Sequence, residues 1–130
     1  METYMINETD IVHNKSVDFV TREPLEPIHI VQYDQTQPII AVKLLSNKKP
    51  YILPKDADVN IRFRKPNMQA VIKPAFGCDI TRSIVYFKVD DKMSACYGKA
   101  WAIIEIKING TAAGTSILPF MIDRNPIENY

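Results

Sequence analysis

Histidine, cysteine and glycine are scarce in this 130-residue chain, and each shortage weighs against a class of chemistry. The two histidines and two cysteines, His13, His29, Cys78 and Cys96, form no CxxC or HxxxH arrangement. Because a structural zinc site usually takes four such ligands, we expect no metal site. The four glycines form no phosphate-binding loop, and the GxSxG motif of a nucleophile elbow is absent. We therefore expect no cofactor, no catalytic residues and no enzymatic activity.

An excess of charge of either sign is also missing, since 16 lysines and arginines face 15 aspartates and glutamates. Nucleic-acid-binding domains usually carry a basic excess, so nucleic acid is not an expected partner. No apolar run approaches the roughly 20 residues that span a bilayer, so we expect no membrane insertion. The polar start, METYMINETD, lacks the basic and apolar segments of a secretory signal. We therefore expect synthesis in a cytoplasm and reduced thiols.

Short apolar runs separated by turn residues are what the sequence has in abundance. They cover residues 28–33, 38–45, 58–65, 70–73, 83–89, 99–108 and 115–123. Several alternate with period two, as where Val59, Ile61 and Phe63 share one face. β-branched and aromatic residues dominate, which favours strands over helices. The spacing of the runs predicts an all-β sandwich or barrel. Of these, the fold we expect is an immunoglobulin-like antiparallel β-sandwich of about seven or eight strands.

Asn109-Gly110 is the clearest turn signal, because a type I′ hairpin turn needs positive φ at both central residues. It predicts that residues 99–108 pair with 111–123. Gly114 within the return strand indicates a bulge or a close backbone approach. Pro119 has no amide hydrogen, which predicts an edge or a bulge at that position.

Residues 1–27 are polar and contain only a short β-like run at 17–20, so we divide the chain into an N-terminal arm, 1–27, and a β-sandwich domain, 28–130. A disordered tail is the alternative for the first segment.

One strand departs from the half-buried pattern, because Trp101 and Ile103 lie on the face of 99–108 that should contact water. Cover by the N-terminal arm is one explanation. The other is a contact surface for another subunit, since exposed aromatic and aliphatic clusters mark interfaces. The candidate interface comprises Trp101 and Ile103 on the strand, with Phe19 and Val20 from the arm.

Four segments together are similar to a known family: YDQTQPIIAVKLL (33–45), DVNIRFRKPN (58–67), ITRSIVYFKVD (80–90) and ACYGKAWAIIEIKINGTAAGTSILPFMID (95–123). In order and spacing they resemble the N-terminal domain family of the phage baseplate upper protein, found in tailed phages and prophages of Gram-positive bacteria. One departure is Asn67-Met68, where members usually have Asp-Gly or Asn-Gly after Lys-Pro.

The resemblance implies a β-sandwich in a virion structural protein. It also implies a module that docks a receptor-binding fibre onto the tail or baseplate, with other virion proteins as partners and a homo-oligomer in the particle. It brings no active site with it. The expected location is the virion, after synthesis in the cytoplasm of a bacterial host.

Other functions stay open beside this one. Exposed aromatic residues on a β-sandwich suit a carbohydrate- or host-receptor-binding module, and the candidates are Tyr33, Tyr51, Tyr86, Tyr97 and Trp101. A head or collar fibre protein would use the same kind of sandwich. An enzyme with scattered catalytic residues would show a deep pocket with ionisable groups of perturbed pKa.

Overall fold

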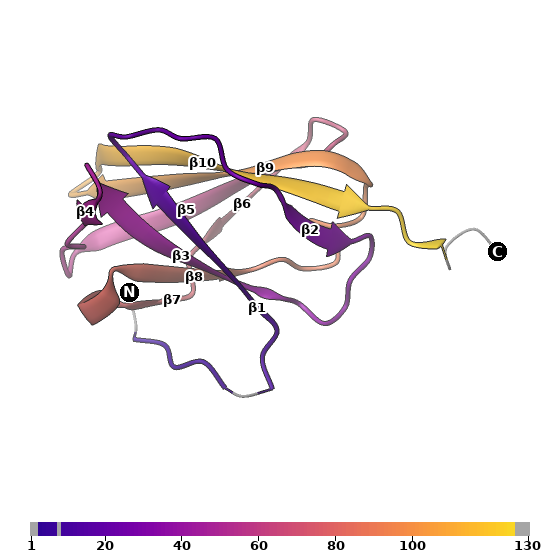
Figure 1. The fold of residues 1–130 in the computed structure, drawn as a ribbon, viewed down its shortest axis with the longest axis horizontal. Helices are drawn as coiled ribbons and strands as arrows, with labels where there is room; N and C mark the ends of the chain where they lie inside the picture. Colours follow the sequence, from indigo (N-terminus) through magenta and orange to yellow (C-terminus); the bar gives the residue numbers. More distant parts are fainter. Residues whose placement is uncertain (1–2, 8, 127–130) are drawn as a thin grey trace.

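Two five-stranded sheets pack face to face in the computed structural model, which describes residues 3–7 and 9–126 (Figure 1). The first sheet has the order β1-β3-β8-β7, with β4 beside β3. Its strands are β1 (Val12–Asp18), β3 (Ile39–Ser46), β4 (Lys49–Pro50), β7 (Gly77–Asp79) and β8 (Ile84–Lys88). A 3₁₀ turn, η1 (Ile80–Arg82), joins β7 to β8.

The second sheet has the order β2-β10-β9-β5-β6. Its strands are β2 (Ile28–Val31), β5 (Ala57–Arg64), β6 (Ala70–Pro74), β9 (Gly98–Ile108) and β10 (Thr111–Asp123). Figure 1 shows its two longest strands, β9 and β10, crossing the molecule on one side while β3 and β8 lie on the other. The predicted all-β sandwich is thus confirmed, and each of the seven apolar runs contains a strand.

The sheets are mixed rather than antiparallel, so that part of the prediction is wrong. β1 pairs with β3 in parallel, and β2 pairs with β10 in parallel. The cause is the path of the N-terminal chain, which adds β1 to one sheet and then crosses to add β2 to the other, instead of turning back in a hairpin. The described residues form ten strands, not seven or eight, because β1, β4 and β7 carry no clear apolar alternation.

The expected N-terminal arm contributes a strand to the sandwich. Residues 12–18 of it form β1, whose Val17 is buried in the main core. The chain then passes through residues 19–27 to β2 in the second sheet. Residues 1–2 of the arm and residue 8 lie outside the described residues.

Aromatic rings fill the space between the sheets. Phe63 on β5 and Phe120 on β10 meet edge to face at 5.2 Å between ring centroids. Phe87 on β8 reaches Phe120 from the opposite sheet at 6.4 Å. All three rings are fully buried, so the period-two alternation of β5, β8 and β10 sends their apolar residues into one shared core.

The β9–β10 hairpin forms as predicted. Asn109 and Gly110 have φ values of 52° and 78°, both positive as a type I′ turn requires. The register shifts by a bulge between Ala112 and Gly114. The Phe19 ring lies 3.3 Å from the position that a Cβ on Gly114 would take, so this glycine combines the bulge with the close approach.

Pro119 lies inside the second sheet, with a paired neighbour on one side only. It pairs with Trp101 of β9, while β2 pairs with β10 only from Phe120 to Asp123. At Pro119 the other edge of β10 is therefore open, and the missing amide hydrogen breaks no ladder there.

Candidate functional site

Trp101 and Ile103 both lie on the outer face of the second sheet, among other apolar side chains. The register of β9 places Trp101 opposite Pro119 and Ile103 opposite Ile117 of β10. On the other side, β5 and β6 bring Ile72 into the same row as Ile103. We call these five residues, Ile72, Trp101, Ile103, Ile117 and Pro119, the apolar band. Ile72, Ile117 and Trp101 are 61%, 50% and 37% exposed, which is unusual for large apolar side chains that share one face.

The N-terminal chain covers the outer face of the first sheet. Tyr4 packs edge to face on Phe76 at 4.7 Å and against Tyr86 at 5.2 Å. Its backbone amide donates to the carbonyl of Cys78 at 3.0 Å, and its hydroxyl donates to Asp10 at 3.0 Å. Trp101 is 37% exposed, and the described arm residues pack on the first sheet and beside the edge of β10, so both explanations for Trp101 stay open.

Phe19 and Val20 do not join the apolar band. Phe19 packs on the core, meeting Tyr51 edge to face at 5.4 Å and lying against Gly114. Val20 is 63% exposed in the turn that follows β1. The four predicted interface residues thus lie in two places, and only Trp101 and Ile103 share a surface.

Two arginines lie between members of the apolar band, on the same face of the sheet. Arg62 and Arg64 alternate with buried residues on β5, and the register places them opposite Ile103 and Trp101. On their other side β6 presents Ile72 and Ala70. The guanidinium Nε of Arg64 is buried and has no hydrogen-bond partner among the described residues. The outer face therefore combines apolar side chains with a buried, unsatisfied cationic donor.

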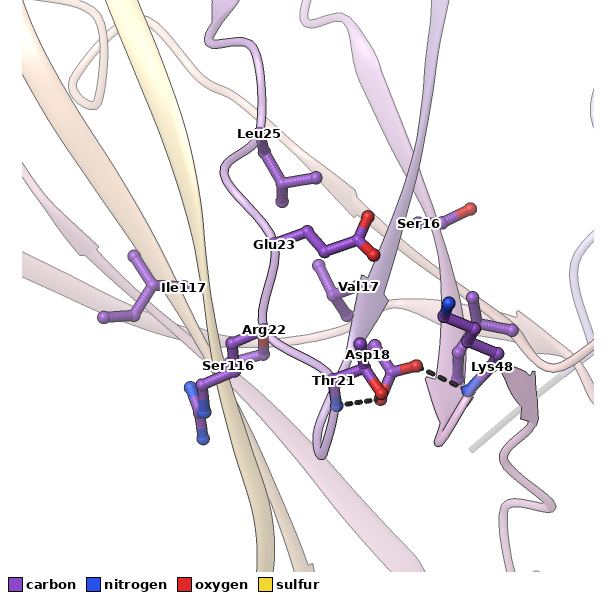
Figure 2. Close-up of a pocket in the computed structure, with 11 residues that line it drawn as sticks. Ser16, Val17, Asp18, Thr21, Arg22, Glu23, Leu25, Lys48, Ser116 and Ile117 are labelled. Atoms are coloured by element: carbon purple, nitrogen blue, oxygen red, sulfur yellow. Dashed lines mark hydrogen bonds between the residues drawn. The ribbon is translucent and has the colours of Figure 1, made fainter.

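A cleft of about 570 Å³ opens between β1, the connecting segment 21–25 and β10, and it shares Ile117 with the apolar band (Figure 2). Val17, Leu25 and Ile117 give it apolar walls, while Arg22 and Glu23 give it charges of both signs. The Arg22 guanidinium donates to the carbonyl of Thr115 at 3.1 Å, so it ties this segment to β10.

Asp18, at the edge of the cleft, accepts hydrogen bonds from four backbone amides. The donors are Val20 and Thr21 after β1, and Asn47 and Lys48 in the β3–β4 turn, at 2.7 to 3.0 Å. Figure 2 shows the bonds to Thr21 and Lys48. Desolvation acts to raise the pKa of Asp18, but the four donors outweigh it and lower that pKa from 3.8 to about 2. Asn47 and Lys48 both have positive φ, so this carboxylate holds an unfavourable turn in place.

The histidines and cysteines, which are the candidate metal ligands, lie far apart in the fold. His29 contacts Asp123 at 3.0 Å on the second sheet, and His13 lies on β1. Cys78 and Cys96 are not joined in a disulfide, and burial raises the pKa of the Cys78 thiol. The described residues contain no cluster of three or more histidines, cysteines or carboxylates able to hold a metal. Within that same part of the chain, no helix has the length and apolar character to cross a membrane.

The sequence contains a signal for the apolar band that extends beyond Trp101 and Ile103. Period two places Ile117 and Pro119 on one face of β10, just as it places Trp101 and Ile103 on one face of β9. From the sequence alone, the alternation of Arg62 and Arg64 with apolar residues indicates a solvated strand face. Their position between apolar neighbours follows from the strand order, which the sequence alone does not supply.

The fold and this surface together define a class of protein, an all-β sandwich of two mixed sheets with exposed apolar residues on the outer face of one sheet. Its fold is similar to a solved structure, the N-terminal domain of phage TP901-1 ORF48. That similarity has a TM-score of 0.64 at 11% sequence identity and covers 85% of this chain and 99% of that one. No family model matches the sequence, and a search of curated proteins found no match.

Proposed function

We propose that this chain is a structural module of a phage tail or baseplate, which docks a receptor-binding fibre or its neighbours onto the particle. The sequence resembles the phage baseplate upper protein family, and the fold is similar to a domain of a phage protein. The observation that carries the docking role is the apolar band, because a bare face of large apolar residues in register is typical of an interface.

Docking on this surface follows the usual physics of interfaces. Burial of Trp101 and its aliphatic neighbours would release water from apolar surface, at about 25 cal/mol for each Å². A specific interface buries about 800 Å² per partner. Tryptophan near the centre of such a patch is the residue type that most often carries the binding energy.

Incorporation of a variant into particles tests this function. Trp101→Ala, expressed from the genome that encodes the chain, should reduce the amount of chain in purified particles at least about tenfold. Ile52→Ala is the matched control, since Ile52 is 82% exposed in the loop after β4 and lies outside the apolar band. Normal incorporation of the folded Trp101→Ala chain would contradict the proposal.

Carbohydrate binding is the second candidate function. Tyr97 directly precedes β9, is 55% exposed and packs with Arg124 at 5.5 Å, so it extends the aromatic character of the Trp101 strand. This function predicts that a glycan array binds the isolated chain and that Tyr97→Ala removes the binding. If the chain docks on a protein surface instead, the array should show no glycan binding for Tyr97→Ala to remove.

A further inference from the structure

The charges on the outer face of the second sheet are arranged unevenly. Its acidic residues are Asp58, Glu105 and Asp123, and its basic or titratable residues are His29, Arg62, Arg64, Lys99 and Lys107. They come from β2, β5, β9 and β10, and none of the acids lies within the apolar band.

Each acid on this face already has a positively charged or titratable neighbour. Lys107 contacts Glu105 at 3.3 Å and lies opposite Asp58 in the register of β5 and β9. His29 contacts Asp123 at 3.0 Å. One lysine faces two of these three carboxylates, so negative charge remains near Asp58 and Glu105, but these acids lie outside the apolar band.

The two arginines have no carboxylate partner among the described residues. Both point outward from β5, two residues apart, between Trp101 and Ile103 on one side and Ile72 on the other. Arg62 is exposed and Arg64 half-buried, and the Nε of Arg64 is covered by the chain itself without an acceptor. Guanidinium groups bind carboxylates through two parallel hydrogen bonds, and such bonds strengthen where water is excluded.

We propose that the occupant of the apolar band is a different protein, whose contacting surface places a carboxylate among apolar side chains and presents it to Arg62 and Arg64. This inference rests on the proposed function, and it adds the chemistry of the partner. A second copy of this chain is the wrong occupant. A two-fold interface with its axis at Arg62 and Arg64 would bring the arginines of both copies together, and their like charges would repel.

A pair of synthetic peptides tests the chemistry without the natural partner. One alternates leucine with glutamate, and its twin carries glutamine in place of each glutamate. Trp101 is the only tryptophan of the chain and lies at the proposed contact, so its fluorescence reports binding to the full-length protein. The glutamate peptide should bind at least about tenfold more tightly at low salt, and the preference should shrink as salt is added.

Variants identify the residues responsible. Arg62→Gln removes an exposed charge, and Arg64→Lys keeps the charge but loses the two-pronged geometry, so each should reduce the preference for glutamate about threefold or more. The matched control is Lys43→Gln, an exposed cation on the first sheet, which should leave the preference unchanged.

Four results would overturn the proposal. The first two are equal affinity for both peptides and a preference that survives the arginine substitutions. The third is inorganic polyphosphate binding as tightly as the glutamate peptide, which would indicate a general anion site. The fourth is a mass that rises with concentration and falls on Trp101→Ala, which would make a second copy the occupant. The peptide experiment can fail while Trp101→Ala still reduces incorporation into particles. That outcome would leave the docking function standing and reject only the partner chemistry.

Discussion

The two outer faces of the sandwich carry aromatic residues in different settings. On the first sheet, Tyr86 is 2% exposed because Tyr4 and Phe76 pack over it. On the second sheet, Trp101 is 37% exposed. The N-terminal chain thus covers Tyr86 on the first sheet, whereas on the second sheet its segment 21–25 lies beside Ile117 at the edge of β10. An apolar residue on an outer strand face therefore contributes to folding where the chain covers it, and is available for binding where the chain leaves it exposed.

Tyr86→Ala should have the largest effect on stability, because it disrupts the packing on the covered face of the first sheet. We expect the free energy of unfolding to fall by about 4 kcal/mol, because a buried aromatic side chain leaves a cavity that its neighbours cannot fill. Urea denaturation followed by circular dichroism measures the change. Tyr4→Ala should cause a smaller loss in the same assay. An unchanged midpoint for both variants would mean that the N-terminal segment does not cover this face.

Trp101→Ala should have a much smaller effect on the isolated chain. Trp101 contacts neighbours within its own sheet but has no covering layer, so we expect a loss of no more than about 1.5 kcal/mol. The same urea titration measures it beside Tyr86→Ala. If Trp101→Ala unfolds the chain, the residue belongs to the core and the distinction between the two faces disappears.

Met68→Gly should stabilise the chain, by about 1 kcal/mol. Met68 ends the β5–β6 turn with φ 71°, a left-handed conformation that costs non-glycine residues about 1–2 kcal/mol. Glycine removes that cost and also loosens the unfolded chain, so the net gain is smaller than the strain. The thermal midpoint should rise. A lower midpoint would show that the exposed Met68 side chain makes stabilising contacts.

Asp18→Asn should flatten the loss of stability in acid. The folded pKa of Asp18, about 2, lies below its ordinary value of 3.8, so its contribution is fully present above 3.8 and is lost as the pH falls from there through about 2. Unfolding free energies measured between pH 5 and 2 should therefore vary less in the variant. Asp56→Asn, on an exposed loop, is the control. Parallel pH profiles for Asp18→Asn and the wild type would refute the role of the four amide donors.

The strands could be predicted where one residue in two is apolar. This holds for β5. β9 and β10 also carry apolar residues on their second face, and the Asn109-Gly110 turn determines how these two strands pair. The sequence does not predict β1 as a strand, because only Val17 among its residues is buried and the rest are polar or half-exposed. Its parallel pairing with β3 depends on a contact between distant parts of the chain, which no local pattern encodes.

The candidate site was predictable in part for a similar reason. Trp101 and Ile103 break the alternation of their strand, so the sequence shows that something must cover them or bind them. Which of these holds depends on where the N-terminal segment packs, and Tyr4 packs on the other sheet. The immunoglobulin-like topology, the oligomeric state and the separate behaviour of residues 1–27 stay predictions.

Quenching of the single tryptophan gives the most direct test of the bare face. In the full-length chain, acrylamide should quench Trp101 efficiently at every protein concentration, and iodide should quench it more than caesium because Arg62 and Arg64 lie beside it. A Trp101 signal shielded from acrylamide at low concentration would mean that the chain covers this face itself. Shielding that appears only at high concentration would mean that a second copy covers it, and either result would contradict a face kept open for a different partner.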